Sequence, residues 1–127
     1  MLKHCTLCPR LCGANRNAGE HGFCGADARI RIGLASLHQW EEPCLSGTNG
    51  AGTVFFCHCP LGCVYCQNHD ISGLDADASG ICTDISGLAD TFLSLQQRGA
   101  HNIDLVTPTQ YAAQLTQAIP LARRRGL

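Results

Sequence analysis

Ten cysteines occur among the 127 residues, and all but Cys44 and Cys82 fall in two short segments. The first segment holds Cys5, Cys8, Cys12 and Cys24, and the second holds Cys57, Cys59, Cys63 and Cys66. Clustered thiols in a reducing compartment are typically metal ligands rather than disulfides. No apolar signal-peptide core follows Met1. We therefore expect a cytoplasmic protein that binds metal through its cysteines.

The second segment has the ligand spacing of an iron–sulfur site. Cys59, Cys63 and Cys66 follow the pattern C-x3-C-x2-C. Three thiolates on one tight loop can hold three corners of a cubane cluster, which leaves the fourth iron open for a ligand. Cys57 adds a fourth thiol, which would either complete a closed zinc site or pack as a small apolar side chain.

The first segment offers a complete set of four thiolates, Cys5-x2-Cys8-x3-Cys12-x11-Cys24. Four is the number that closes a zinc site or holds a second iron–sulfur cluster, and the spacing does not choose between them. Pro9 and Arg10 stiffen this loop, and the arginine adds positive charge that favours thiolate formation.

The elements around the second segment are predicted from hydrophobic periodicity. Residues 53–56 form an apolar run that is typical of a strand buried on both faces. A helix is predicted over 85–98, with Asp84 as its N-cap and Gly99 as its stop. Residues 28–36 alternate weakly, which indicates a short strand or hairpin arm.

A second strand–helix pair follows in the same order. We expect a strand at 103–106 and a helix near 110–125 that Pro120 kinks or restarts, with residues 69–82 as a loop. An alternation of strand and helix in this order indicates βα units with right-handed crossovers and a parallel sheet. Ligands bind at the carboxyl ends of such strands, where the second cysteine segment begins.

Several motifs together resemble one known subfamily. They are WEEP at 40–43, GTVFF at 52–56, CPLGCVYCQN at 59–68, IS at 71–72, GAHNIDLVTPTQY at 99–111 and the N-terminal CTLCPRLCGANRNAGEHGFC. The chain resembles the pyruvate formate-lyase-activating-enzyme-like subfamily of the radical S-adenosylmethionine (SAM) superfamily over nearly its whole length.

The resemblance implies a [4Fe–4S] cluster on Cys59, Cys63 and Cys66 that cleaves SAM reductively to a 5′-deoxyadenosyl radical. It also implies the fold, which is the N-terminal portion of a partial (β/α)6 barrel. In this interpretation residues 1–27 are a cysteine-rich metal-binding segment, and residues 28–127 begin the radical SAM α/β domain. Only two βα units are present, so a second chain is a candidate partner that would complete the barrel.

Four further residues are candidates for cofactor binding, and none is predicted to be catalytic. Tyr65 would lie near the adenine of SAM, or it is a half-buried loop aromatic. Asn68 would hydrogen-bond near the cluster or shape a turn. By position, Thr107 and Thr109 could contact the amino acid end of SAM, or they mark a strand end and a helix cap.

The implied partners are reduced flavodoxin or ferredoxin as electron donor and a glycyl radical enzyme as protein substrate. An iron–sulfur or zinc-binding module without catalysis is the alternative. The formal net charge is −1, and the basic run 123–125 suits a helix C-terminus, so no nucleic-acid partner is expected. No apolar run approaches the ~20 residues of a membrane span.

Overall fold

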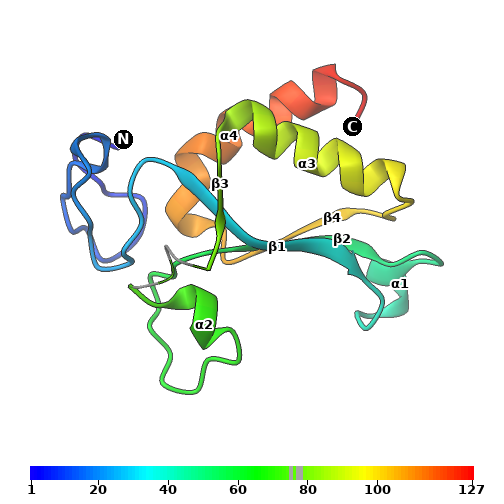
Figure 1. The fold of residues 1–127 in the computed structure, drawn as a ribbon, viewed down its shortest axis with the longest axis horizontal. Helices are drawn as coiled ribbons and strands as arrows, with labels where there is room; N and C mark the ends of the chain where they lie inside the picture. The colour runs from blue at the N-terminus through cyan, green and yellow to red at the C-terminus, as the bar shows by residue number, and fades with distance from the viewer. Residues whose placement is uncertain (75, 77–78) are drawn as a thin grey trace.

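A computed structural model describes residues 1–74, 76 and 79–127, in which four strands form one mixed sheet (Figure 1). The strands are β1 (Ile30–His38), β2 (Ala51–Phe56), β3 (Ile81–Thr83) and β4 (Ile103–Val106). Their order in the sheet is β3-β1-β2-β4. β1 runs antiparallel to both of its neighbours, whereas β2 and β4 are parallel.

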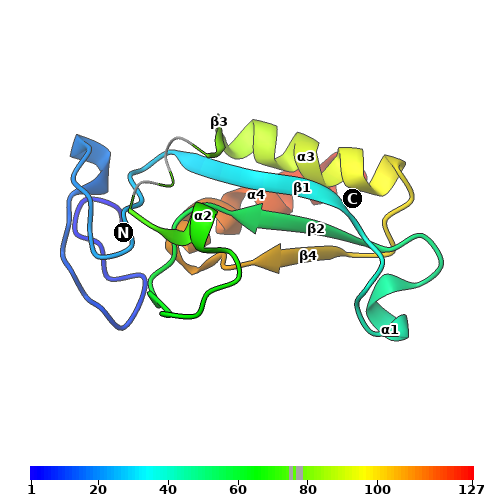
Figure 2. The same cartoon turned by 60° about the horizontal axis from the view of Figure 1, so that its bottom comes forward.

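Two long helices cover one face of this sheet (Figures 1 and 2). The helices are α1 (Pro43–Ser46), α2 (His69–Ser72), α3 (Ile85–Gln97) and α4 (Ala112–Arg124), with 3-10 turns η1 (Arg16–Ala18) and η3 (Thr109–Tyr111). Short α1 lies at one end of the sheet. The N-terminal segment (residues 1–27) and α2 lie at the other end. Among the described residues no helix is long and apolar enough to cross a membrane.

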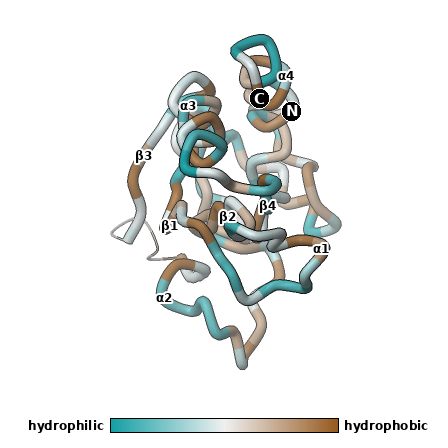
Figure 3. The backbone as a smooth tube through the Cα atoms, turned by 90° about the vertical axis from the view of Figure 1, so that its right-hand side faces the viewer, coloured by the Kyte–Doolittle hydropathy of each residue, from teal (hydrophilic) through white to brown (hydrophobic). Residues whose placement is uncertain are grey.

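The hydrophobic core lies between the sheet and the two long helices. Val54 and Phe56 of β2 are at most 1% exposed, and they meet Leu88 and Phe92 of α3. The ring of Tyr111 packs on Phe56 with 5.5 Å between centroids. Figure 3 shows hydrophobic stretches along the strands and in α3. Burial of these side chains supplies the main force that holds helices and sheet together.

Both ends of α3 agree with the sequence prediction. The Asp84 carboxylate accepts a hydrogen bond from the Gly87 N–H at 2.8 Å, which confirms the N-cap. Gly99 has φ +93°, the left-handed conformation in which a glycine ends a helix at low cost. The buried residues Leu88, Ala89, Phe92 and Leu95 share the face that the helical spacing predicts.

The second predicted helix is also present, with two differences. It starts with the separate 3-10 turn η3, and α4 then continues through Pro120 to Arg124. Of the two predicted alternatives at Pro120, a kink or a restart, the restart does not occur.

The predicted partial (β/α)6 barrel is wrong. A barrel of that kind is built from parallel strands, each followed by a helix. Here β1 lies inside the sheet and pairs antiparallel with β2 on one side and β3 on the other, so the described strands contain a single parallel pair. The sheet is a small mixed one.

The physical reason lies in two segments whose pairing the local pattern does not reveal. The sequence predicts a short arm at residues 28–36, yet β1 extends to His38 and pairs along the full length of β2. The predicted loop 69–82 contains α2 and begins β3, whose Ile81 pairs with Ile32 of β1. A three-residue strand is too short to carry a period, so only the tertiary pairing defines it.

Candidate metal centre

The second cysteine segment forms a loop, residues 57–68, that we call the cysteine loop. It leaves the carboxyl end of β2 and leads into α2. Because β2 and β4 are parallel, the residues that follow β4 lie at the same edge of the sheet. The Thr107 hydroxyl donates to the Phe56 carbonyl at 3.4 Å across this edge. The predicted location at the carboxyl ends of parallel strands is confirmed for this pair.

A buried glutamine fixes the first two residues of the cysteine loop, Cys57 and His58, which we call its root. The Gln110 side-chain amide donates to the Cys57 carbonyl at 2.9 Å and to the His58 carbonyl at 2.8 Å. His58 is fully buried at φ +66°, and its Nδ1 lies 3.3 Å from the Gly73 carbonyl oxygen. The positive φ of His58 and these hydrogen bonds together fix the direction in which the rest of the loop leaves β2.

Beyond the root, the three predicted cluster ligands lie in a more open part of the loop. Cys59 and Cys66 are half-buried and Cys63 is exposed. The Leu61 N–H donates to the Cys59 sulfur at 3.5 Å, and the Ser72 hydroxyl donates to the Cys66 sulfur at 3.6 Å. Hydrogen-bond donors to the sulfurs are also a common feature of protein metal–thiolate sites.

The donor set fits the chemistry of an iron–sulfur cluster, but the described conformation does not gather it. All three thiols are free of disulfides. Among residues 1–74, 76 and 79–127, no three His, Cys, Asp or Glu side chains are grouped as a metal site. Gly62 has φ +69° between Cys59 and Cys63, and it allows the sharp turn that would bring these sulfurs together.

Arg10 connects the N-terminal segment to this loop. Its Nε donates to the Pro60 carbonyl and its Nη2 to the Leu61 carbonyl, both at 3.1 Å. The guanidinium also lies 3.7 Å from the centroid of the Phe23 ring. From the sequence, Arg10 is expected to stabilise the neighbouring thiolates through its positive charge. In the structure it holds the backbone between Cys59 and Cys63.

The four N-terminal cysteines lie in one folded segment. Cys5 and Cys24 are buried, Cys8 is half-buried and Cys12 is exposed. The Cys5 N–H donates to the Ala14 carbonyl, and the Gly13 N–H donates to the Cys5 carbonyl, both at 3.0 Å. This two-way pairing places Cys5 beside Cys12, although the four thiols do not yet form a metal-binding group in the described part of the chain.

The electrostatics of these thiols differ from one another. The pKa of Cys12 is lowered, chiefly by the Ala14 N–H, with further contributions from the Phe23 N–H and the Cys5 thiol. Burial raises the pKa of Cys24, and the Ala26 backbone and the charge of Arg16 offset part of that rise.

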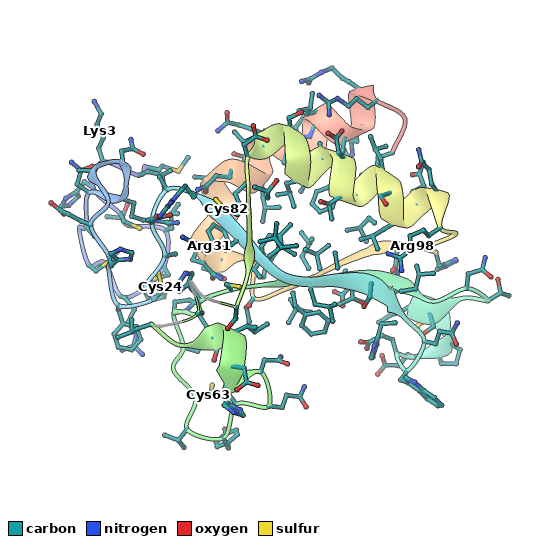
Figure 4. All side chains as sticks on the ribbon, viewed as in Figure 1. Lys3, Cys24, Arg31, Cys63, Cys82 and Arg98 are labelled. Atoms are coloured by element: carbon teal, nitrogen blue, oxygen red, sulfur yellow. The ribbon has the colours of Figure 1, made fainter. Side chains whose placement is uncertain are left out.

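Three cysteines belong to neither set of predicted ligands, namely Cys44, Cys57 and Cys82. Cys57 is fully buried, and its sulfur occupies the space where Gly80 lacks a side chain. Cys44 in α1 and Cys82 in β3 are exposed. Figure 4 shows Cys24 and Cys63 at the same end of the molecule, with Cys82 on the separate strand β3.

The predicted SAM-binding residues are only partly brought together. Thr107 (φ +52°) lies at the root of the cysteine loop, and Thr109 begins η3 with its side chain exposed. Tyr65 is 88% exposed. The Asn68 carbonyl accepts from the Ile71 and Ser72 N–H groups at 3.1 Å, so its backbone starts α2.

Sequence reasoning missed three residues that fix the site, namely Arg16, His58 as a buried anchor, and Gln110. Arg16 and Gln110 are 94 positions apart, and no local pattern links them. The one sequence feature that could have indicated a structural role for Arg16 is its charge within a loop rich in glycine and cysteine.

Comparison with known proteins gives a limited result. No protein-family model matches the chain, and no solved structure matches it. It is similar to an uncharacterized protein of Methanocaldococcus jannaschii, with 41% identity over 75 residues. Those residues are 57% of this chain and 20% of the relative, so the match spans about a fifth of the relative's length. The relative's name states no activity.

Proposed function

We propose that this chain is an iron–sulfur protein of the radical SAM class, in which Cys59, Cys63 and Cys66 hold a [4Fe–4S] cluster. The observation that carries the proposal is the placement of three free thiols on one loop at the carboxyl edge of the parallel pair β2 and β4. Three ligands on a four-iron cluster leave one iron for an exogenous ligand, as an open position does in catalytic metal sites.

The chain's own residues would position and shield such a group. Gln110 and His58 fix the direction in which the loop leaves β2. The Leu61 N–H and the Ser72 hydroxyl donate to ligand sulfurs, and donors to the sulfurs tune the reduction potential of such a cluster. Reductive cleavage of SAM to a 5′-deoxyadenosyl radical is the chemistry that the cluster supplies when bound.

Thr107 and Tyr65 are the side chains that would contact SAM in this proposal. Thr107 is fixed at the loop root. Tyr65 is exposed and would have to fold onto its ligand. A flavodoxin or ferredoxin would deliver the electron, and a glycyl radical protein is the proposed substrate. The activity of the whole protein, its partners and its substrate all belong to this proposal.

The test is anaerobic reconstitution with iron and sulfide, followed by EPR of the dithionite-reduced chain with and without SAM. We expect a cubane signal that changes when SAM is added, because SAM would ligate the open iron. Cys63→Ala should abolish that response. Cys82→Ala removes an exposed cysteine on β3 and should leave the response unchanged.

Two results would contradict the proposal. One is a chain that retains zinc but no iron. The other is a cluster whose EPR signal is indifferent to SAM, which would instead indicate a binding or electron-transfer module without radical chemistry.

A further inference from the structure

Two arginines connect the N-terminal segment to the cysteine loop, Arg10 directly and Arg16 through Gln110. Arg10 lies between Cys8 and Cys12 in the sequence, and its guanidinium bridges the Pro60 and Leu61 carbonyls. Its planar fork donates to two neighbouring backbone acceptors at once, a geometry that a lysine cannot reproduce. The fold of residues 5–12 therefore determines where this part of the cysteine loop is held.

Arg16 makes the second connection through the interior. It is 1% exposed, and its guanidinium donates to the Asp27 carbonyl at 2.6 Å and to the Gln110 carbonyl at 2.5 Å. It also lies 3.9 Å from the Cys5 sulfur. Gln110 in turn donates to the Cys57 and His58 carbonyls. Cys5 is thus linked to the loop root through two buried side chains.

The two cysteine segments also share a cavity of about 320 Å³. Phe23 and Cys24 line it from the N-terminal segment, and Cys59 and Gly62 line it from the cysteine loop. Movement of the N-terminal segment would therefore change the packing around Cys59 directly.

Sulfur contacts in the N-terminal set suit a single ion better than a cubane. The Cys12 sulfur packs against the bare Cα of Gly22, on the same side of the segment as the neighbouring Cys5 thiol. Neighbouring thiols can share one tetrahedral ion with Zn–S distances of about 2.3 Å, whereas a four-iron cluster holds its thiolates farther apart. A 27-residue segment with one 3-10 turn also needs such a staple to hold its shape.

We propose that Cys5, Cys8, Cys12 and Cys24 bind one structural zinc ion, and that this ion orders the cysteine loop through Arg10. Zinc would draw in Cys8 and close the turn that carries Arg10. The guanidinium would then be fixed on the Pro60 and Leu61 carbonyls. The site needs no iron–sulfur cluster and does not rest on the proposed radical chemistry.

The experiment uses the full chain with Cys59→Ser, Cys63→Ser and Cys66→Ser together, so the cysteine loop keeps none of its three predicted cluster ligands. We expect this variant to retain one zinc per chain after desalting. Cobalt substitution should give the visible bands of a tetrahedral tetrathiolate site. Adding Cys12→Ser, an exposed position, should abolish both signals while circular dichroism confirms the fold.

Hydrogen–deuterium exchange then tests the coupling on the same triple-serine chain. Zinc should slow exchange of the amides of residues 61–66 by about tenfold, the scale of a local ordering transition. Arg10→Ala and Arg10→Lys should keep the zinc and lose the slowing. Arg125→Ala, which removes a distant surface arginine bonded to Asp90, should keep both.

The zinc site and its coupling to the cysteine loop are refuted by different results. Absence of zinc from the triple-serine chain, or iron in its place, refutes the zinc site. Bound zinc without slower exchange at residues 61–66, or equal slowing in Arg10→Ala, refutes the coupling. The EPR response to SAM is measured on the chain with its loop cysteines intact, so failure of the proposed function is seen separately.

Discussion

At the scale of single residues, Arg16 and Asp27 are charged side chains buried between the N-terminal segment and the rest of the chain. Arg16 donates to the backbone carbonyls of Asp27 and Gln110, which are uncharged acceptors. Asp27 is 6% exposed and is bonded by the Arg29 side chain and N–H. These two residues join the N-terminal segment to the α/β core.

Replacing Arg16 by methionine should lower the free energy of unfolding by about 2–3 kcal/mol. The apolar side chain fills similar space but leaves the Asp27 and Gln110 carbonyls buried without donors. Urea denaturation followed by circular dichroism measures the loss. Arg98→Met is the matched control on an exposed side chain, and an equal loss there would contradict this prediction.

Asp27→Asn should destabilise the chain at neutral pH and make little difference in acid. Burial alone would raise the pKa of Asp27, but the Arg29 side chain and N–H lower it. A lowered folded-state pKa gives stability that is present above the unfolded value of about 3.9 and is lost as pH falls through the folded value. Urea denaturation between about pH 2 and pH 6 should show the two chains converging in acid.

The control for this pH effect is the same substitution in an Arg29→Ala background. Without the guanidinium, the stability difference between the chain that keeps Asp27 and the chain with Asp27→Asn should depend much less on pH. An unchanged pH dependence would mean that Arg29 is not its source.

At the scale of elements, α3 forms because local signals and tertiary packing agree. Its cap, its apolar face and its terminal glycine are all readable in the sequence. The weak alternation at 28–36 predicts a strand, and β1 confirms it, but nothing local predicts β3 or its pairing with β1, because an antiparallel partner 50 residues away leaves no local mark. The same holds for the site. The spacing of Cys59, Cys63 and Cys66 is local, whereas Arg10, Arg16 and Gln110 act on residues 50 to 94 positions distant.

Removing the α3 cap by Asp84→Ala should cost about 1 kcal/mol, because the Gly87 N–H loses its acceptor. Asp90→Ala makes the same chemical change in the exposed middle of the helix. It should cost less, since its surface pair with Arg125 contributes little. Thermal and urea unfolding of both variants provide the comparison, and a larger effect at Asp90 would contradict the cap.

At the scale of the whole molecule, one core on one face of the sheet supports the fold. Leu88→Ala should lower the free energy of unfolding by about 2–5 kcal/mol, because Leu88 is fully buried beneath the sheet. Leu34→Ala in β1 removes a leucine that is 53% exposed and should cost much less. Similar losses at both positions, measured by urea denaturation, would show that the core is not where the structure places it.

The outer position of β4 has a consequence for the behaviour of concentrated solutions. Within the described part of the chain, β4 pairs only with β2, so its other side presents backbone donors and acceptors. The formal net charge of −1 gives little repulsion between copies. Colloidal stability should therefore be low. Light scattering should show association that grows with protein concentration and is suppressed when a lysine is placed on β4, for example by Asp104→Lys.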